Sequence, residues 1–153
     1  MSPVPEIQLL KGFCNFNFGQ VVTEAEVLFG AAEETQTLED DILETSSFVL
    51  HYWSTGFSLF FDKNKGNVFS SVEVDNKETL MFKQKIFLLS EKALIELLKT
   101  NGYKLTENET HSWGEKRLSF DDAGLDCYFE NGKLISINFG VSNFGNNFSY
   151  FPN

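Results

Sequence analysis

The feature that most constrains the fold of this chain is an internal repeat. Residues 50–62 (LHYWSTGFSLFFD) align without a gap on residues 118–130 (LSFDDAGLDCYFE), with a glycine at the same place in both segments. The segments that follow, 65–72 and 131–137, also correspond once one or two insertions are allowed. A chain of 153 residues has room for one ordinary domain or two very small ones. We therefore expect two copies of one structural unit.

Each copy, residues 1–76 and 77–153, has the pattern of a short helix followed by three strands, with a further strand before the helix. Thr23 has a glutamate three residues later, which is capping-box spacing, and Ser90 is placed to cap a helix over 91–100. Glycine-containing turns separate the strands, as in antiparallel hairpins. The sequence predicts an α+β fold of two tandem βαβββ repeats in one pseudo-symmetric unit, with antiparallel sheets and helices packed on one sheet face.

Successive residues of a strand point to opposite sides of a sheet, so alternation assigns side chains to its two faces. Five positions are apolar in both copies and should face the helices: Leu50, Tyr52, Phe57, Leu59 and Phe61, matched by Leu118, Phe120, Leu125, Cys127 and Phe129. The alternate positions include Trp53, Phe60, Tyr128 and His51, a mixture typical of protein-binding patches. Alternatively, the two copies or the C-terminal residues bury these aromatic side chains against each other.

The chain is acidic, with 22 Asp and Glu against 12 Lys and Arg and a formal net charge of −10. This balance excludes a phosphate-tracking nucleic-acid binder and disfavours docking on an anionic membrane. The first copy carries 12 acidic and 3 basic side chains, so nearly all of the excess lies there. Its densest cluster falls in the predicted loop between the helix and the first hairpin strand, at Glu39, Asp40, Asp41 and Glu44. These carboxylates either keep the loop solvated or steer a basic partner toward the protein.

Local motifs for metal or nucleotide chemistry are absent from the sequence. Cys14 and Cys127 lie far apart among alternating apolar residues, so we expect reduced thiols. His51 and His111 have no second His or Cys at metal-ligand spacing. A glycine-rich phosphate loop, a GxSxG elbow and an HExxH pair do not occur. We therefore predict no catalytic residue, no metal site and no cofactor.

The N-terminal residues lack a basic region followed by a long apolar stretch, and no apolar run approaches 18 residues. We expect neither a signal peptide nor a membrane span. Together with the isolated cysteines, this composition predicts a cytoplasmic protein.

The two copies share a short motif: a glycine, a Ser/Thr-capped helix closing on a glycine, and strands of the form Gly-x-x-Phe-Asp-x-x-Gly-Lys-Val. It covers residues 19–30 and 56–68 in the first copy and 90–98 and 124–137 in the second. With these motifs the chain resembles bacterial tandem-repeat proteins of the β-lactamase-inhibitor-protein type and the related SmpA/BamE-like domains. It lacks the Pro that often follows the closing glycine and the secretion signal usual in those families. The resemblance implies the two-copy architecture and binding of another protein by an open sheet face.

We interpret the chain as a non-catalytic protein-binding module, of inhibitor or immunity type, for a basic partner protein. The candidate partner-binding residues are Trp53, Phe60, Tyr128 and His51 on the sheet and Glu39, Asp40, Asp41 and Glu44 for steering. Two alternatives stay open. One is a small-ligand-binding or enzymatic domain with a pocket between the repeats, and the other is a structural subunit that forms a homodimer through the same sheet.

Overall fold

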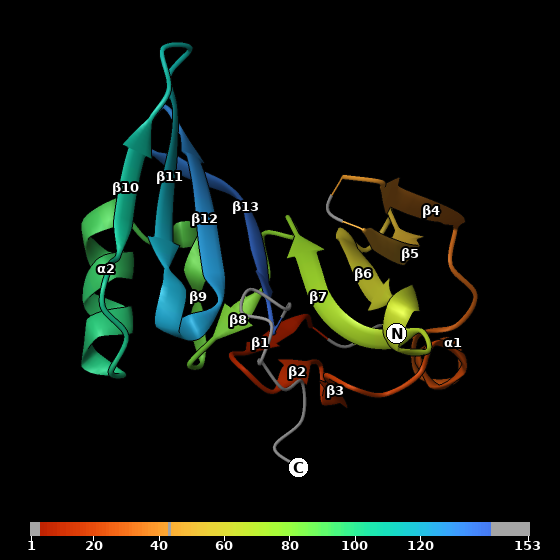
Figure 1. The fold of residues 1–153 in the computed structure, drawn as a ribbon. Coiled ribbons are helices and arrows are strands. Elements are labelled where there is room, and N and C mark those ends of the chain that lie inside the picture. Colours follow the sequence, from red (N-terminus) through yellow and green to blue (C-terminus); the bar gives the residue numbers. More distant parts are fainter. Residues whose placement is uncertain (1–3, 43, 142–153) are drawn as a thin grey trace.

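A large antiparallel sheet organises the computed structural model, which describes residues 4–42 and 44–141 of the chain (Figure 1). Its eight strands lie in the order β10-β11-β12-β13-β7-β6-β5-β4. Their bounds are β4 Glu34–Asp40, β5 Thr45–Tyr52, β6 Phe57–Asp62, β7 Val68–Val74, β10 Glu107–Thr110, β11 Glu115–Phe120, β12 Leu125–Glu130 and β13 Lys133–Gly140. At the centre, residues 71–74 of β7 pair with residues 137–140 of β13. The last strand of each four-strand group therefore joins the groups into one sheet.

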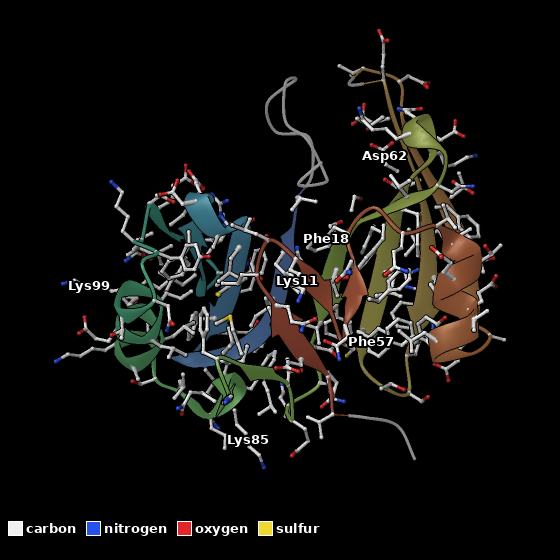
Figure 2. The ribbon with its side chains drawn as sticks, turned by 90° about the horizontal axis from the view of Figure 1, so that it is seen from below. Lys11, Phe18, Phe57, Asp62, Lys85 and Lys99 are labelled. Carbon is white, nitrogen blue, oxygen red and sulfur yellow. The ribbon has the colours of Figure 1, made fainter. Side chains whose placement is uncertain are left out.

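A second sheet of five short strands covers one face of the large sheet. Its order is β3-β2-β1-β8-β9, with bounds β1 Glu6–Gln8, β2 Gly12–Phe13, β3 Phe16–Asn17, β8 Leu80–Met81 and β9 Gln84–Lys85. The parallel pairing of β1 with β8 links the two predicted repeats, whose boundary at residue 76 stays a prediction. The helices α1 (Val22–Phe29) and α2 (Glu91–Thr100) lie at opposite ends of the molecule, with β1–β3 between them (Figure 2).

The predicted α+β class, with helices covering one sheet face, is wrong. The structure is mostly β, with 47% strand and 20% helix, and its described residues form two α-helices and two sheets. The segments expected to give one strand before each helix, 7–18 and 80–88, instead contribute the short strands of the small sheet. This sheet, rather than a helix, covers the centre of the buried face.

Phenylalanine side chains of the small sheet explain why it can take this place. The ring centroid of Phe13 lies 5.0 Å from that of Phe57 and 6.1 Å from that of Phe139, and Phe16 lies 4.9 Å from Phe69. Aromatic rings bury large areas and pack in such tilted arrangements. A few short strands therefore supply the apolar surface that a helix would otherwise provide.

The predicted burial of the shared apolar positions is confirmed, but burial does not alternate strictly, because His51, Ser58 and Ser119 at alternate positions are buried as well. All of the apolar positions shared by the two copies are buried, namely Leu50, Tyr52, Phe57, Leu59, Phe61, Leu118, Phe120, Leu125, Cys127 and Phe129. They belong to one apolar cluster that also contains residues of the small sheet and of both helices. The core therefore extends beneath one face of the large sheet from β5 to β11.

The two predicted helix starts had different outcomes. Ser90 Oγ accepts a hydrogen bond from the backbone N–H of Ala93 at 3.1 Å, and α2 follows directly, as predicted. The prediction that Thr23 caps α1 is wrong, because this helix begins at Val22 and has Val21 as its N-cap. Glu24 then occupies the third helical position, and its carboxylate accepts the N–H of Val21 at 3.1 Å.

Two strands are polar, and one of them, β4, lies where we predicted a loop. Glu39 and Asp40 belong to β4, and only Asp41 and Glu44 lie in the turn that follows. Residues 107–110 likewise form β10. Neither strand has a buried residue, and both lie at the edges of the large sheet. Backbone pairing with one neighbour holds them in place without a contribution from the core.

Candidate protein-binding surface

The face of the large sheet that points away from the small sheet, here called the outer face, carries a row of polar side chains. One residue from each strand lies in register with the next across all eight strands: Glu34, His51, Ser58, Glu73, Asn138, Asp126, Ser119 and Glu107. Directly opposed side chains on one sheet face are about 5 Å apart. The row holds four carboxylates and no Lys or Arg, and we call it the acidic band.

His51 is held inside the acidic band and is only 6% exposed. Its Nδ1 lies 2.7 Å from Ser58 Oγ, and its Nε2 lies 2.9 Å from Gln36 Oε1. With the Gln36 oxygen as acceptor, Nε2 carries the proton and Nδ1 accepts the Ser58 hydroxyl. The predicted site residue His51 therefore supports its neighbours and has little surface to offer a partner.

The Ser58–His51 contact has the distance of a nucleophile and its general base. Ser58 is only 3% exposed, however, and lies within strand β6. A substrate carbonyl has no approach to this hydroxyl, so the pair does not support nucleophilic catalysis.

Trp53 is the most exposed of the three predicted anchors, at 58%. Its indole stacks on the His51 ring, with centroids 4.1 Å apart and planes 11° from parallel. The indole Nε1–H also donates to Glu34 Oε1 at 3.0 Å. Two contacts therefore fix the indole while more than half of its surface stays open to a partner.

Phe60 and Tyr128 also lie on the outer face, and both are half-buried. Burial raises the pKa of the Tyr128 phenol, and the nearby Asp126 carboxylate raises it further. Tyr128 thus stays neutral at physiological pH and can donate a hydrogen bond.

The structure spreads the predicted site residues over the surface and does not gather them at one point. Tyr128 on β12 is four strand spacings from Trp53 at the end of β5, or roughly 19 Å. Asp40 is six residues along β4 from Glu34, or roughly 20 Å. Glu39, Asp40, Asp41 and Glu44 are all exposed at the far end of the β4–β5 hairpin.

Sequence reasoning missed an ion-pair network on the second half of the outer face. Arg117 on β11 lies 2.9 Å from Glu107, 3.2 Å from Glu109 and 3.8 Å from Asp126. Partial burial alone would lower the pKa of Arg117, but the three carboxylates raise it. Asp126 also accepts the hydroxyl hydrogen of Ser119. Each contact joins neighbouring strands, so the network depends on strand pairing that no local sequence motif predicts.

A hollow lies where the two halves of the sheet meet on the outer face. It has a volume of about 220 Å³ and is lined by Phe60, Ser71, Gly124, Asp126, Asn138 and Gly140, among others. Pockets for small-molecule ligands usually measure about 300–1,000 Å³. Neither His51 nor His111 lines this hollow. Its size gives little support to an enzymatic pocket between the repeats, and the adjoining hollow of about 400 Å³ is lined by residues of the second copy, Asp121, Gly124, Leu125 and Asp126.

The cysteines are free, as expected, with Cys127 buried and Cys14 partly buried. Burial raises the pKa of Cys14 to about 11 and raises that of Cys127 further, so both thiols are protonated at neutral pH. Within residues 4–42 and 44–141, no group of three or more His, Cys, Asp and Glu side chains is arranged to hold a metal ion. None of the described helices combines the length and apolar character needed to cross a bilayer.

No protein-family model, curated protein or solved structure matches this chain. The resemblance to the inhibitor-type repeat proteins therefore stays a prediction. Function has to be argued from the surface itself, that is, from the acidic band and the exposed indole beside it.

Proposed function

We propose that the protein is a non-catalytic binding module whose outer face binds a basic partner protein, in the manner of an inhibitor or an immunity protein. The observation that carries this proposal is the acidic band, in which Glu34 and Glu73 have no ion pair with a described cation, while Asp126 and Glu107 are paired with Arg117. A surface with one sign of charge attracts and orients a partner of the opposite sign.

Trp53 supplies the apolar anchor of this surface. Tryptophan is enriched among residues that dominate binding energy, and a fixed side chain loses little conformational entropy on association. The His51 stack and the Glu34 hydrogen bond hold the indole before any partner arrives. Phe60 and Tyr128 add partly exposed aromatic surface further across the sheet.

The exposed carboxylates at the β4–β5 turn have a different role. They lie roughly 20 Å from the Trp53 end of β4, which is beyond the contacts of that anchor. Screened charges act over about 8–10 Å at physiological salt. Asp41 and Glu44 therefore lie too far from Trp53 to strengthen the contact at that anchor. Their role is to raise the association rate of a basic partner.

Native mass spectrometry of the protein purified with its bound components from its natural source tests this function. We expect a heteromeric mass containing a basic protein, and Trp53→Ala should weaken that complex by about 30-fold or more, as truncation of an anchor does. Trp113→Ala removes another exposed indole, stacked on His111, from the β10–β11 turn and serves as the matched control.

Three results would contradict the proposal. A doubled mass would favour the structural homodimer, and a bound small molecule would favour the ligand-binding alternative. Equal losses from Trp53→Ala and Trp113→Ala would also show that the Trp53 end of the outer face is not the contact surface. Thermal unfolding of both variants separates loss of binding from loss of fold.

A further inference from the structure

Strand β4 ends the large sheet, and among the described residues only β5 pairs with it. In an antiparallel strand, the N–H and C=O of one residue point to the strand on one side, and those of the next residue point to the other side. Within residues 35–39 of β4, the N–H and C=O groups that point away from β5 have no partner strand in the described part of the chain. The pairing with β5 runs without a bulge from Glu34 to Asp40, and all seven residues are exposed. The strand is therefore a straight, open template for another strand.

Natural sheets usually protect such an edge with charged side chains, especially Lys, or with Pro, a bulge or a very short strand. Strand β4, ETQTLED, is seven residues long and has no Pro and no Lys, and its three charges are all carboxylates, which oppose an acidic strand but not a basic one. The opposite edge differs, because β10 has four residues and its Glu107 and Glu109 are paired with Arg117. Glu34 and Glu39 of β4 have no ion pair with a described cation.

Charge decides which strand fits this edge. In a symmetric antiparallel pairing with a second copy, Glu34 would face Asp40 and Thr35 would face Glu39, so carboxylates would oppose each other. Residues 142–153 of the chain contain no charged side chain and gain nothing from these carboxylates. A segment with Lys or Arg gains cross-strand attraction at both ends of β4.

We infer that β4 binds an extended, basic segment of the partner protein, which adds to the large sheet as a ninth strand. This inference rests on the proposed function and names the part of the partner that is bound. In an antiparallel addition, the bound segment carries Lys or Arg at the position that faces Glu39. It carries a second Lys or Arg five positions later, at the position that faces Glu34. The residue facing Leu38, which is 42% exposed, is apolar.

Trp53 lies at the end of this edge. Its Nε1–H donates to Glu34 Oε1, so a cation that approaches Glu34 also comes close to the indole. A cation over an indole face is attracted by the ring quadrupole. Trp53 therefore both contributes to binding and reports it by its fluorescence.

The probe is the capped hexapeptide Lys-Val-Thr-Thr-Val-Lys, added to the full chain carrying Trp113→Phe so that Trp53 is the only indole. We expect the Trp53 emission to change and the amides of alternate β4 residues to gain protection from hydrogen exchange, with weaker binding at higher salt. Glu34→Gln with Glu39→Gln should weaken binding by about fivefold, and it keeps an acceptor for the Trp53 N–H. Glu96→Gln with Asp122→Asn makes the same charge change at exposed positions outside the acidic band and should leave binding unchanged.

Two N-methylated forms of the peptide test strand addition directly. Methylation of the alternate amides that face β4 should abolish binding, and methylation of the other set should not. Absence of binding, equal binding by both methylated forms, or binding without protection of β4 would overturn the inference.

The partner complex separates this inference from the proposed function. If Trp53→Ala disrupts that complex and the Glu34 and Glu39 variant does not, the edge is not used but the outer face is. If neither change affects the complex, both proposals fail.

Discussion

The two halves of the large sheet, β4–β7 and β10–β13, share a strand order and a buried pattern but balance charge differently. At positions matched by the repeat, the second half pairs Ser119 with Asp126, and the first half pairs Ser58 with His51. Arg117 then neutralises carboxylates of the second half. Glu34 and Glu73 of the first half form no ion pair with the described cations. One scaffold thus carries a half in which Arg117 pairs with carboxylates and a half in which Glu34 and Glu73 are left for a partner.

The largest effect is expected for substitutions in the core, where matched positions of the two halves should lose similar amounts of stability. Phe61 and Phe129 occupy matched positions and are 0% and 1% exposed. Phe61→Ala and Phe129→Ala should each lower the free energy of unfolding by about 3–5 kcal/mol, measured by urea denaturation. The half-buried Phe60→Ala is the control and should lose less. A large loss for only one of the matched pair would show that the halves are not equivalent in the core.

A smaller loss of stability is expected from a substitution that makes the first half more like the second. The Tyr52 hydroxyl donates to the Gly30 carbonyl at 2.8 Å, and the matched residue Phe120 has no hydroxyl. Tyr52→Phe should cost about 1 kcal/mol of stability at neutral pH, because one hydrogen bond is lost and the Gly30 oxygen is left without it. An unchanged midpoint of urea unfolding would show that this bond is not a stabilising difference between the halves.

The same variant should change the stability at alkaline pH. Burial raises the pKa of Tyr52 to about 12, and the Glu26 carboxylate adds to the rise, against about 10 in an unfolded chain. The folded state favours the neutral phenol, so its contribution is complete below pH 10 and is lost as the pH rises toward 12. Tyr52→Phe should therefore lose less stability than the natural protein across that window. Parallel pH profiles for the two proteins would contradict this assignment.

The smallest effect is expected at Arg117, where one change removes the internal pairing of the second half. Arg117→Gln should cost about 1 kcal/mol, because the pairs are only partly buried. Added salt should then stabilise the variant, since Glu107, Glu109 and Asp126 repel one another and salt screens the repulsion. Unfolding at several ionic strengths measures this. Lys85→Gln removes a single exposed pair with Glu78 and should show a weaker salt response.

The buried half of the fold could be predicted because its signal is local. Alternating Leu, Phe and Tyr on β5, β6, β11 and β12 report burial directly, and Ser90 precedes a strongly amphipathic helix. The polar strands could not be predicted in this way. Neither ETQTLED nor ENET has an apolar face, and each is held by backbone pairing that its own sequence does not encode.

The candidate site was only partly predictable for a related reason. Trp53 lies on the alternate face as expected, but its support by His51 and Glu34 needs the register of β4 against β5. The small sheet was missed because strands of two or three residues are too short for periodicity to develop. Its role became visible only through the contacts of Phe13 and Phe16 with the large sheet.

The central pairing of β7 with β13 has a consequence for biosynthesis. Val74 pairs with Ile137, so β7 leaves the ribosome long before its partner strand is made. At about 5–20 residues per second, that delay lasts roughly 3–13 s. During this time the apolar segment Val68–Val74 presents an open edge to other nascent chains. Translation speed and chaperone access should therefore control the yield of this protein, and chains interrupted before β13 should aggregate.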